Sequence, residues 1–120
     1  MIRIAIIDDH AIVRAGLRQF LAEHGDLAVV AEAASGREAL DIVRKAEVDV
    51  VVMDISMPDR SGLETLELLR KEHPGIKVLM LSMHRETQYA VRALKTGAAG
   101  YLNKQSAPDQ LVDAIRLVAS

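Results

Sequence analysis

Hydrophobic residues along the chain follow two alternating patterns. Short runs rich in Val, Ile and Leu predict strands, and the segments between them repeat apolar residues at the three- and four-residue spacing of a helix. The strands predicted from these runs are Ile2–Ile7, Leu27–Ala33, Val48–Met53, Ile76–Leu81 and Gly100–Leu102. The third run is almost continuously apolar, which is typical of a strand covered on both faces, as in a parallel sheet.

Serine residues mark where three of the predicted helices should begin. Ser35, Ser61 and Ser106 each precede an acidic residue by three positions, so each hydroxyl can accept a hydrogen bond from a backbone N–H of the first turn. Strands that alternate with helices in this way predict an α/β fold, a doubly wound parallel sheet with helices on both faces. We interpret residues 1–120 as one domain, because no linker or internal repeat divides them.

The composition excludes several classes of protein. The chain has no cysteine, so it forms neither disulfides nor thiolate metal sites. Its 15 basic and 17 acidic residues give a net charge of −2, which offers no basic surface for nucleic acid. The sequence has no apolar run of membrane-spanning length and no signal-peptide pattern. We therefore expect an intracellular, cytoplasmic protein that makes no membrane contact.

Candidate chemistry gathers at the residues that follow the predicted strands, where doubly wound sheets bind their ligands. Asp8 and Asp9 follow the first strand, Asp54 follows the third, Ser82 the fourth and Lys104 the fifth. Three clustered carboxylates repel one another unless a cation joins them, and oxygen ligands at a partly open edge suit Mg²⁺. A carboxylate nucleophile, a metal, a hydroxyl and an ammonium together predict a phosphoryl-transfer site.

Each of these residues taken alone has a simpler explanation. Asp8 or Asp9 is as often a helix cap or turn former, Ser82 more often a plain loop residue, and Lys104 more often a solvated lysine. Their joint placement at the strand ends favours the site. We interpret His10 as a solvated residue of the first helical turn. The methionines are interpreted as packing residues: Met53, Met57, Met80 and Met83.

Four segments, in order, match a known family: Ile6–His10, Val52–Gly62, Leu81–Met83 and Gly97–Lys104. Along essentially its whole length the chain resembles the receiver domain of bacterial two-component response regulators. The first and last of these segments are similar to the NarL/FixJ branch, whose members usually carry a C-terminal LuxR-type helix-turn-helix output domain. We expect no such domain within these residues. The resemblance implies a flavodoxin-like (βα)5 fold with strand order 2-1-3-4-5.

The resemblance also implies a role for each residue of the site. Asp54 is the phosphoryl acceptor, Asp9 binds Mg²⁺ directly, and Asp8 often does so through water. The remaining roles fall to the backbone carbonyl of Ser56 as a metal ligand, to Ser82 and Lys104 as partners of the phosphoryl oxygens, and to Tyr101 as the aromatic residue that rotates with the switch. The chain departs from the family at Gln105, where many members have a proline after the lysine.

The function implied by the resemblance is a phosphorylation-dependent signalling switch, which catalyses only its own phosphorylation and dephosphorylation. Its expected partners are a sensor histidine kinase as phosphodonor, a second copy in a phosphorylation-linked homodimer, and DNA only through an output domain. Movement of Ser82 toward the phosphoryl group is expected to let Tyr101 turn inward and reshape the surface near Val91 and Lys95, with the first and fifth helices as a rival surface. The plainer alternative is that Tyr101 covers apolar surface with its hydroxyl in water.

Three other functions compete with this interpretation. A flavin- or dinucleotide-binding module needs a Gly- or Ser-rich phosphate cradle after the first strand, where this chain has acidic residues. A hydrolase with an aspartate nucleophile needs a general acid or base and a substrate pocket, for which the chain has no spare sequence. A degenerate receiver that serves only in dimerisation is the main alternative, and the complete set of acidic, hydroxyl and lysine residues argues against it.

Overall fold

The computed structural model describes residues 1–54, 62–82, 87–103 and 108–120. Its strands are β1 (Ile2–Ile7), β2 (Leu27–Ala33), β3 (Val50–Asp54), β4 (Lys77–Ser82) and β5 (Gly100–Asn103). Its helices are α1 (Ala11–Ala22), α2 (Gly36–Lys45), α3 (Gly62–Glu72), α4 (Thr87–Thr96) and α5 (Pro108–Ala119). The strands pair in parallel in the order β2-β1-β3-β4-β5, which confirms the predicted α/β fold and strand order.

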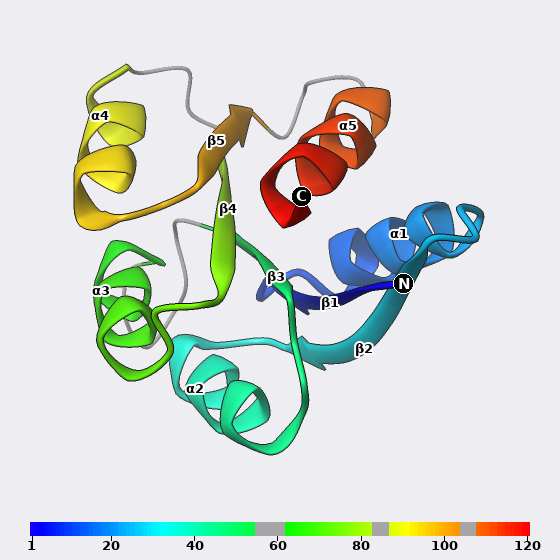
Figure 1. Ribbon diagram of the computed structural model, residues 1–120, viewed down its shortest axis with the longest axis horizontal. Helices are drawn as coiled ribbons and strands as arrows, with labels where there is room; N and C mark the ends of the chain where they lie inside the picture. Colours follow the sequence, from blue (N-terminus) through cyan, green and yellow to red (C-terminus); the bar gives the residue numbers. More distant parts are fainter. Residues whose placement is uncertain (55–61, 83–86, 104–107) are drawn as a thin grey trace.

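Helices cover both faces of this sheet. Figure 1 shows α1 and α5 on one side, and α2, α3 and α4 on the other. Because successive side chains of a strand point to opposite faces, β3 contributes to both layers. Val52 belongs to the same apolar cluster as Ile115 of α5, whereas Val51 and Met53 belong to the cluster that contains Leu66 of α3. The continuously apolar run seen in the sequence is thus buried on both sides.

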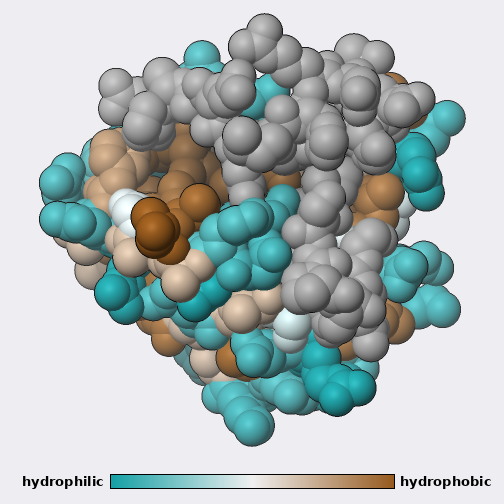
Figure 2. Space-filling view, turned by 180° about the vertical axis from the view of Figure 1, so that it is seen from behind, coloured by the Kyte–Doolittle hydropathy of each residue, from teal (hydrophilic) through white to brown (hydrophobic). Residues whose placement is uncertain are grey.

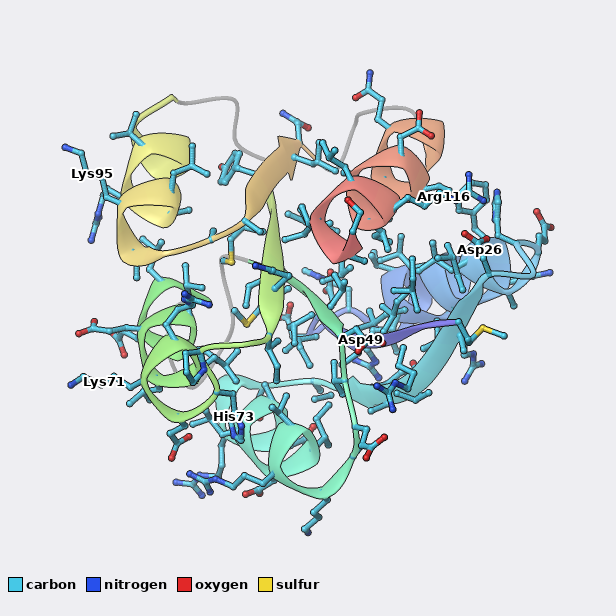
Figure 3. All side chains as sticks on the ribbon, viewed as in Figure 1. Asp26, Asp49, Lys71, His73, Lys95 and Arg116 are labelled. Carbon is cyan, nitrogen blue, oxygen red and sulfur yellow. The ribbon has the colours of Figure 1, made fainter. Side chains whose placement is uncertain are left out.

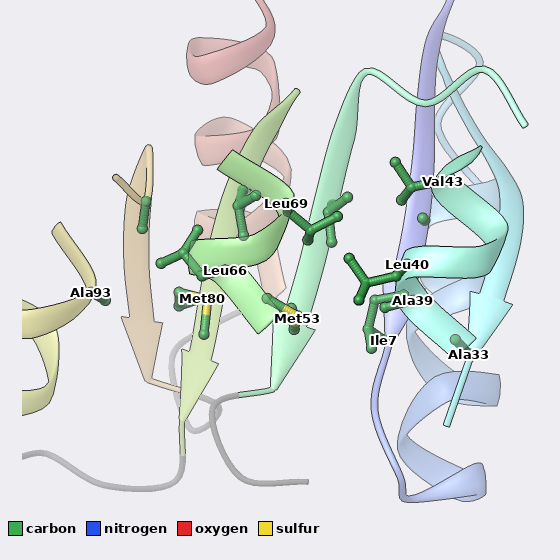
Figure 4. Packing of buried hydrophobic residues seen from close by; sticks show 14 residues of the cluster. Ile7, Ala33, Ala39, Leu40, Val43, Met53, Leu66, Leu69, Met80 and Ala93 are labelled. Atoms are coloured by element: carbon green, nitrogen blue, oxygen red, sulfur yellow. The ribbon is translucent and has the colours of Figure 1, made fainter. Parts of the chain in front are cut away.

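The core on the α2–α4 face is built from aliphatic side chains and methionine. Figure 4 shows Leu66 and Leu69 of α3 packed over the sheet beside Met53 and Met80. Both methionines have no exposed surface, which confirms that they are packing residues. The predictions for Met57 and Met83 lie outside the described residues.

The third strand begins and ends later than predicted. It starts at Val50 instead of Val48 and includes Asp54 as its last residue. Just before this strand, Asp49 is bound to Arg3 partly through its side chain, whose carboxylate accepts a hydrogen bond from the backbone N–H of Arg3 at 2.8 Å. Regular pairing begins at Val50, opposite Ile4 and two residues after the predicted start. At the other end, Asp54 is still paired with Leu81 of β4, so it belongs to the sheet.

The predicted start of α2 is confirmed in detail. The hydroxyl of Ser35 accepts a hydrogen bond from the backbone N–H of Glu38 at 3.2 Å. The carboxylate of Glu38 in turn accepts one from the backbone N–H of Ala34 at 2.8 Å. Two backbone donors that the helix itself leaves unpaired are thereby satisfied. The caps predicted at Ser61 and Ser106 lie outside the described residues.

Replacing Ser35 with alanine is expected to lower the free energy of unfolding by about 1 kcal/mol, because one cap hydrogen bond is lost. Urea denaturation measures this change. The matched control is Ser120→Ala, which removes an exposed serine hydroxyl that donates to the carbonyl of Leu117 in the last turn and should change the value by less than about 0.5 kcal/mol. Equal losses in the two variants would contradict the capping role.

Candidate phosphoryl-acceptor site

Two acidic side chains are buried where β1 and β3 end. Asp54 is 4 % exposed as the last residue of β3, and Asp8, which directly follows β1, is 1 % exposed. The two strands are parallel neighbours, with Ile7 paired with Met53, so these acids leave the sheet side by side. The side chain of Asp9 stands next to them and is 31 % exposed. The convergence of three carboxylates at this edge, expected from the sequence, is therefore present.

His10 is largely solvated, as predicted, with 61 % of its side chain exposed, but it stands just before the helix. It is the N-cap residue of α1, before the first turn, and its ring Nδ1 lies 2.9 Å from Oδ1 of Asp8 and 3.1 Å from Oδ1 of Asp9. Its backbone N–H also donates to Oδ1 of Asp8 at 2.8 Å. This solvated residue thus also contacts both acids, which was not predicted from the sequence. The signal available in the sequence was its place in the turn, directly after the acidic pair.

The four side chains fit a small divalent cation. One ligand atom from each of Asp8, Asp9, His10 and Asp54 lies within 4.8 Å of the others. Opposite ligands of an octahedral Mg²⁺ ion are about 4.2 Å apart, twice its usual bond length, so a small inward movement would suffice. Mg²⁺ prefers carboxylate oxygen, carbonyl oxygen and water to imidazole nitrogen. The donor set therefore suits Mg²⁺ through the acids, with His10 beside them.

The backbone of Ser82 reaches the same edge of the sheet. Leu81 of β4 pairs with Asp54, and Ser82 is the next residue, paired with Asn103 of β5. Because Asn103 immediately precedes Lys104 in the sequence, the two strand ends that should supply a hydroxyl and an ammonium are neighbours. Three predicted features lie outside the described part of the chain: the side chain of Ser82, the carbonyl of Ser56 and the whole of Lys104.

Tyr101 lies on β5 opposite Met80 and packs against the core of the α2–α4 face. Its hydroxyl oxygen is buried and has no hydrogen-bond partner in the part of the chain that the structure describes. The alternative in which this hydroxyl stands in water is therefore wrong. A buried hydroxyl without a partner costs free energy, so packing of the ring must offset that cost.

Charge pairs stabilise other parts of the molecule. Arg3 bonds Asp49 at 3.1 Å and also contacts Glu47, and its hydrogen bonds hold the pKa of Asp49 below its usual value. Asp26 and Arg116 lie side by side (Figure 3) and are 2.9 Å apart, and this hydrogen bond lowers the pKa of Asp26. Stabilisation by such acids is present above their unfolded-state pKa and is lost as pH falls through the folded-state pKa.

Both candidate contact surfaces carry exposed apolar residues. On α4, Val91 and Leu94 are 47 % and 52 % exposed, and Lys95 points outward from the same helix (Figure 3). On the rival surface, Ile12 of α1 and Leu117 of α5 are 88 % and 75 % exposed. In the described part of the face drawn in Figure 2, hydrophobic groups stand among hydrophilic ones. Among the described residues, no helix combines the length and the apolar character needed to span a bilayer.

Comparison with known proteins gives one consistent answer. Residues 4–116 match the model of the response regulator receiver domain. Two relatives are the transcriptional regulatory protein UhpA of Escherichia coli, 48 % identical over 100 % of this chain and 60 % of its own length, and DegU of Brevibacillus brevis, 42 % identical over 98 % and 50 %. The crystal structure of a LuxR-family response regulator from an Aurantimonas species superimposes with a TM-score of 0.94 at 38 % identity, covering 98 % of this chain and 84 % of that one.

The fold, the acidic edge of the sheet formed by Asp8, Asp9 and Asp54, and the sequence similarity together define the class of protein. The chain belongs to the response regulator receiver domain family. Its relatives are regulators of the NarL/LuxR type in two-component systems, as the sequence resemblance implied. It is a signalling switch and not a conventional enzyme. The chain spans only about half to three fifths of the length of the curated relatives named above.

Proposed function

We propose that this receiver domain takes a phosphoryl group onto Asp54 from a sensor histidine kinase and passes the change to a partner surface. The observation that carries the proposal is the meeting of Asp8, Asp9 and Asp54 within 4.8 Å, with Asp54 almost fully buried. A solvated acid could serve as a cap or a surface charge, but three acids that converge at one point, two of them buried, form a site of concentrated negative charge that suits a divalent cation.

The proposed reaction is a displacement at phosphorus. A carboxylate oxygen of Asp54 forms the new bond, while the bond between phosphorus and the kinase imidazole, or the oxygen of a small donor, breaks and the leaving group keeps its electron pair. Burial of Asp54 at the end of β3 fixes the attacking oxygen before the donor arrives, which reduces the cost of orientation. Lys104 and Ser82 are proposed to bind the phosphoryl oxygens by an ammonium contact and a hydroxyl hydrogen bond.

Mg²⁺ is the cofactor of the proposed site. Asp9 and Asp54 would hold it directly, Asp8 through water, and the carbonyl of Ser56 would complete the protein ligands. When bound, the ion neutralises charge on the phosphoryl oxygens. The burial of Asp8 supports this assignment, because a buried side chain beside Asp54 has little freedom to move away from the ion.

The output of the proposed switch is a change of surface. The relatives are named as transcriptional regulatory proteins, which supports an action on DNA through an output domain and a homodimer controlled by phosphorylation. The exposed Val91 and Leu94 of α4 support that helix as the contact surface, and Ile12 and Leu117 support the rival one.

Replacing Ser82 with alanine is expected to leave phosphorylation of Asp54 intact but to reduce the response of Tyr101. A ligand shifts a two-state element only through its different affinities for the two states, so loss of the hydroxyl that senses the phosphoryl group should weaken the coupling. Ring NMR of Tyr101 and sedimentation, each with and without beryllofluoride as phosphoryl mimic, measure it. Ser120→Ala is the control, and identical responses in wild type and Ser82→Ala would disprove the coupled motion.

The proposal as a whole is tested by intact-mass measurement after incubation with acetyl phosphate and Mg²⁺. We expect one phosphoryl group per chain, and none when the metal is removed with EDTA. A chain that remains unmodified at any donor concentration, while it stays folded, would favour the degenerate receiver that serves only in dimerisation.

A further inference from the structure

Arg14 of α1 reaches back over the acidic turn between β1 and α1, which carries the acidic pair Asp8 and Asp9. Its Nη1 donates a hydrogen bond to the backbone carbonyl of Asp8 at 2.5 Å. The direction follows from helix geometry, because side chains tilt toward the helix N-terminus and Arg14 lies one turn after the cap residue His10. Hydrogen bonds from a charged donor are shorter and stronger than neutral ones, so this contact holds the carbonyl firmly.

The guanidinium is itself anchored to β2. Its Nε lies 3.7 Å from Oε1 of Glu32, and the side chain of Arg14 is only 21 % exposed. The backbone N–H of Asp8 donates to the carbonyl of Ala33 at 3.0 Å, also on β2. The backbone of Asp8 is thus tied to the end of β2 on both sides, directly through its N–H and through Arg14 at its carbonyl.

The peptide group that Arg14 holds is the one that joins Asp8 to Asp9. Because a peptide is planar, fixing its carbonyl oxygen also fixes the direction of the bonds to both α-carbons. We propose that Arg14 is a positioning residue for the acidic pair, which holds the two carboxylates at the angle that a cation between them and Asp54 requires. This inference rests on the proposed Mg²⁺ site and adds a residue to it.

Two effects of removing Arg14 have opposite signs. Loss of a positive charge near the acids should by itself tighten the binding of a cation, since like charges repel. Loss of the hydrogen bond should weaken binding, because groups that orient metal ligands typically change affinity by about tenfold to a hundredfold when removed. If positioning dominates, Mg²⁺ affinity falls although a positive charge has been removed. A purely electrostatic role of Arg14 would give the opposite result, a higher affinity.

The test compares Arg14→Gln with Arg18→Gln. Arg18 pairs with the same acid, with Nη1 2.9 Å from Oε2 of Glu32, but the structure gives it no contact with the acidic turn among the described residues. Titration of the ¹⁵N-labelled domain with Mg²⁺ gives the dissociation constant, and the amide nitrogen of Asp9, which belongs to the held peptide, reports the lost hydrogen bond before metal is added. We expect about tenfold weaker binding and a displaced Asp9 resonance in Arg14→Gln, and neither in Arg18→Gln.

Unchanged or tighter Mg²⁺ binding in Arg14→Gln would overturn the inference, as would an equal loss in both variants. If Arg14→Gln does not fold, Arg14→Lys decides: it keeps the charge, but one nitrogen replaces the two guanidinium nitrogens that face the Asp8 carbonyl and Glu32, so the planar fork that fixes the carbonyl is lost. Weaker binding with a displaced Asp9 resonance supports the inference, and wild-type values overturn it. The two hypotheses can also fail separately. If Arg14→Gln binds Mg²⁺ weakly but acetyl phosphate never modifies the domain, the positioning role of Arg14 is supported and only the phosphoryl-acceptor function is refuted.

Discussion

Asp54→Asn is expected to take up no phosphoryl group from acetyl phosphate, whereas the wild-type domain takes up one. Asparagine has nearly the same shape as aspartate, so it should fit the 4 % exposed position at the end of β3. Its amide oxygen is a far weaker nucleophile than a carboxylate oxygen, and the acyl phosphate cannot form on it. Intact mass spectrometry, with and without EDTA, measures the uptake.

Asp113→Asn is the matched control, since Asp113 is an exposed acid on α5 and is not one of the residues of the acidic edge. It should be phosphorylated as wild type is. Uptake that persists in Asp54→Asn, in a chain with an unchanged melting temperature, would show that another residue is the acceptor. Loss of uptake in both variants would show that the assay responds to general damage and not to the acceptor.

Mg²⁺ is expected to raise the melting temperature of the wild-type domain. A ligand that binds only the folded state stabilises it by about 2.7 kcal/mol at a hundred times its dissociation constant. For a domain of 120 residues this corresponds to about 10 °C. Differential scanning calorimetry across a Mg²⁺ series, from EDTA to millimolar metal, measures the shift, and Na⁺ at matched ionic strength separates specific binding from screening.

Asp9→Asn is expected to remove most of this response and also to raise the melting temperature of the metal-free domain. The variant loses one of three carboxylates that lie together at the acidic edge, so repulsion falls by an amount on the order of 1 kcal/mol. Asp9 suits the experiment because its side chain is 31 % exposed, whereas a change at the buried Asp8 would disturb packing as well. An unchanged Mg²⁺ response in Asp9→Asn would exclude Asp9 as a ligand.

Arg3 and Asp49 show where prediction from the sequence fell short. The apolar run that begins at Val48 predicted a strand from there, and the strand begins at Val50. Just before the strand, the carboxylate of Asp49 bonds the backbone of Arg3, which is 46 positions away in the chain. A pattern of neighbouring residues carries no information about such a contact, so strand limits are less predictable than strand positions.

The contacts that His10 and Arg14 make with the acids were likewise not predicted. Nothing in the local pattern distinguishes an arginine that bonds a backbone carbonyl from one in solvent. Helix geometry directs Arg14 back toward Asp8, and the packing of α1 beside β2 brings its guanidinium to Glu32 as well. The buried hydroxyl of Tyr101 has the same origin, since the core beneath β5 is assembled from α2, α3 and α4.

The sequence by itself determined the order of strands and helices, the two-sided burial of β3 and the choice of Asp8, Asp9 and Asp54 as candidate residues. It could do so because apolar periodicity and the position of acids after strands are local properties, and parallel strands place their carboxyl ends at one edge. Only the tertiary structure decided that Asp8 and Asp54 are buried, that His10 touches the acids and that Arg14 ties their turn to β2. The burial of the two acids and the link of Arg14 to Glu32 depend on contacts between segments far apart in the chain, whose geometry is set by how the helices and strands pack. The contacts of His10 and Arg14 with Asp8 join residues only two and six positions apart, but they depend on the three-dimensional path of the turn, which the pattern of apolar and polar residues does not give.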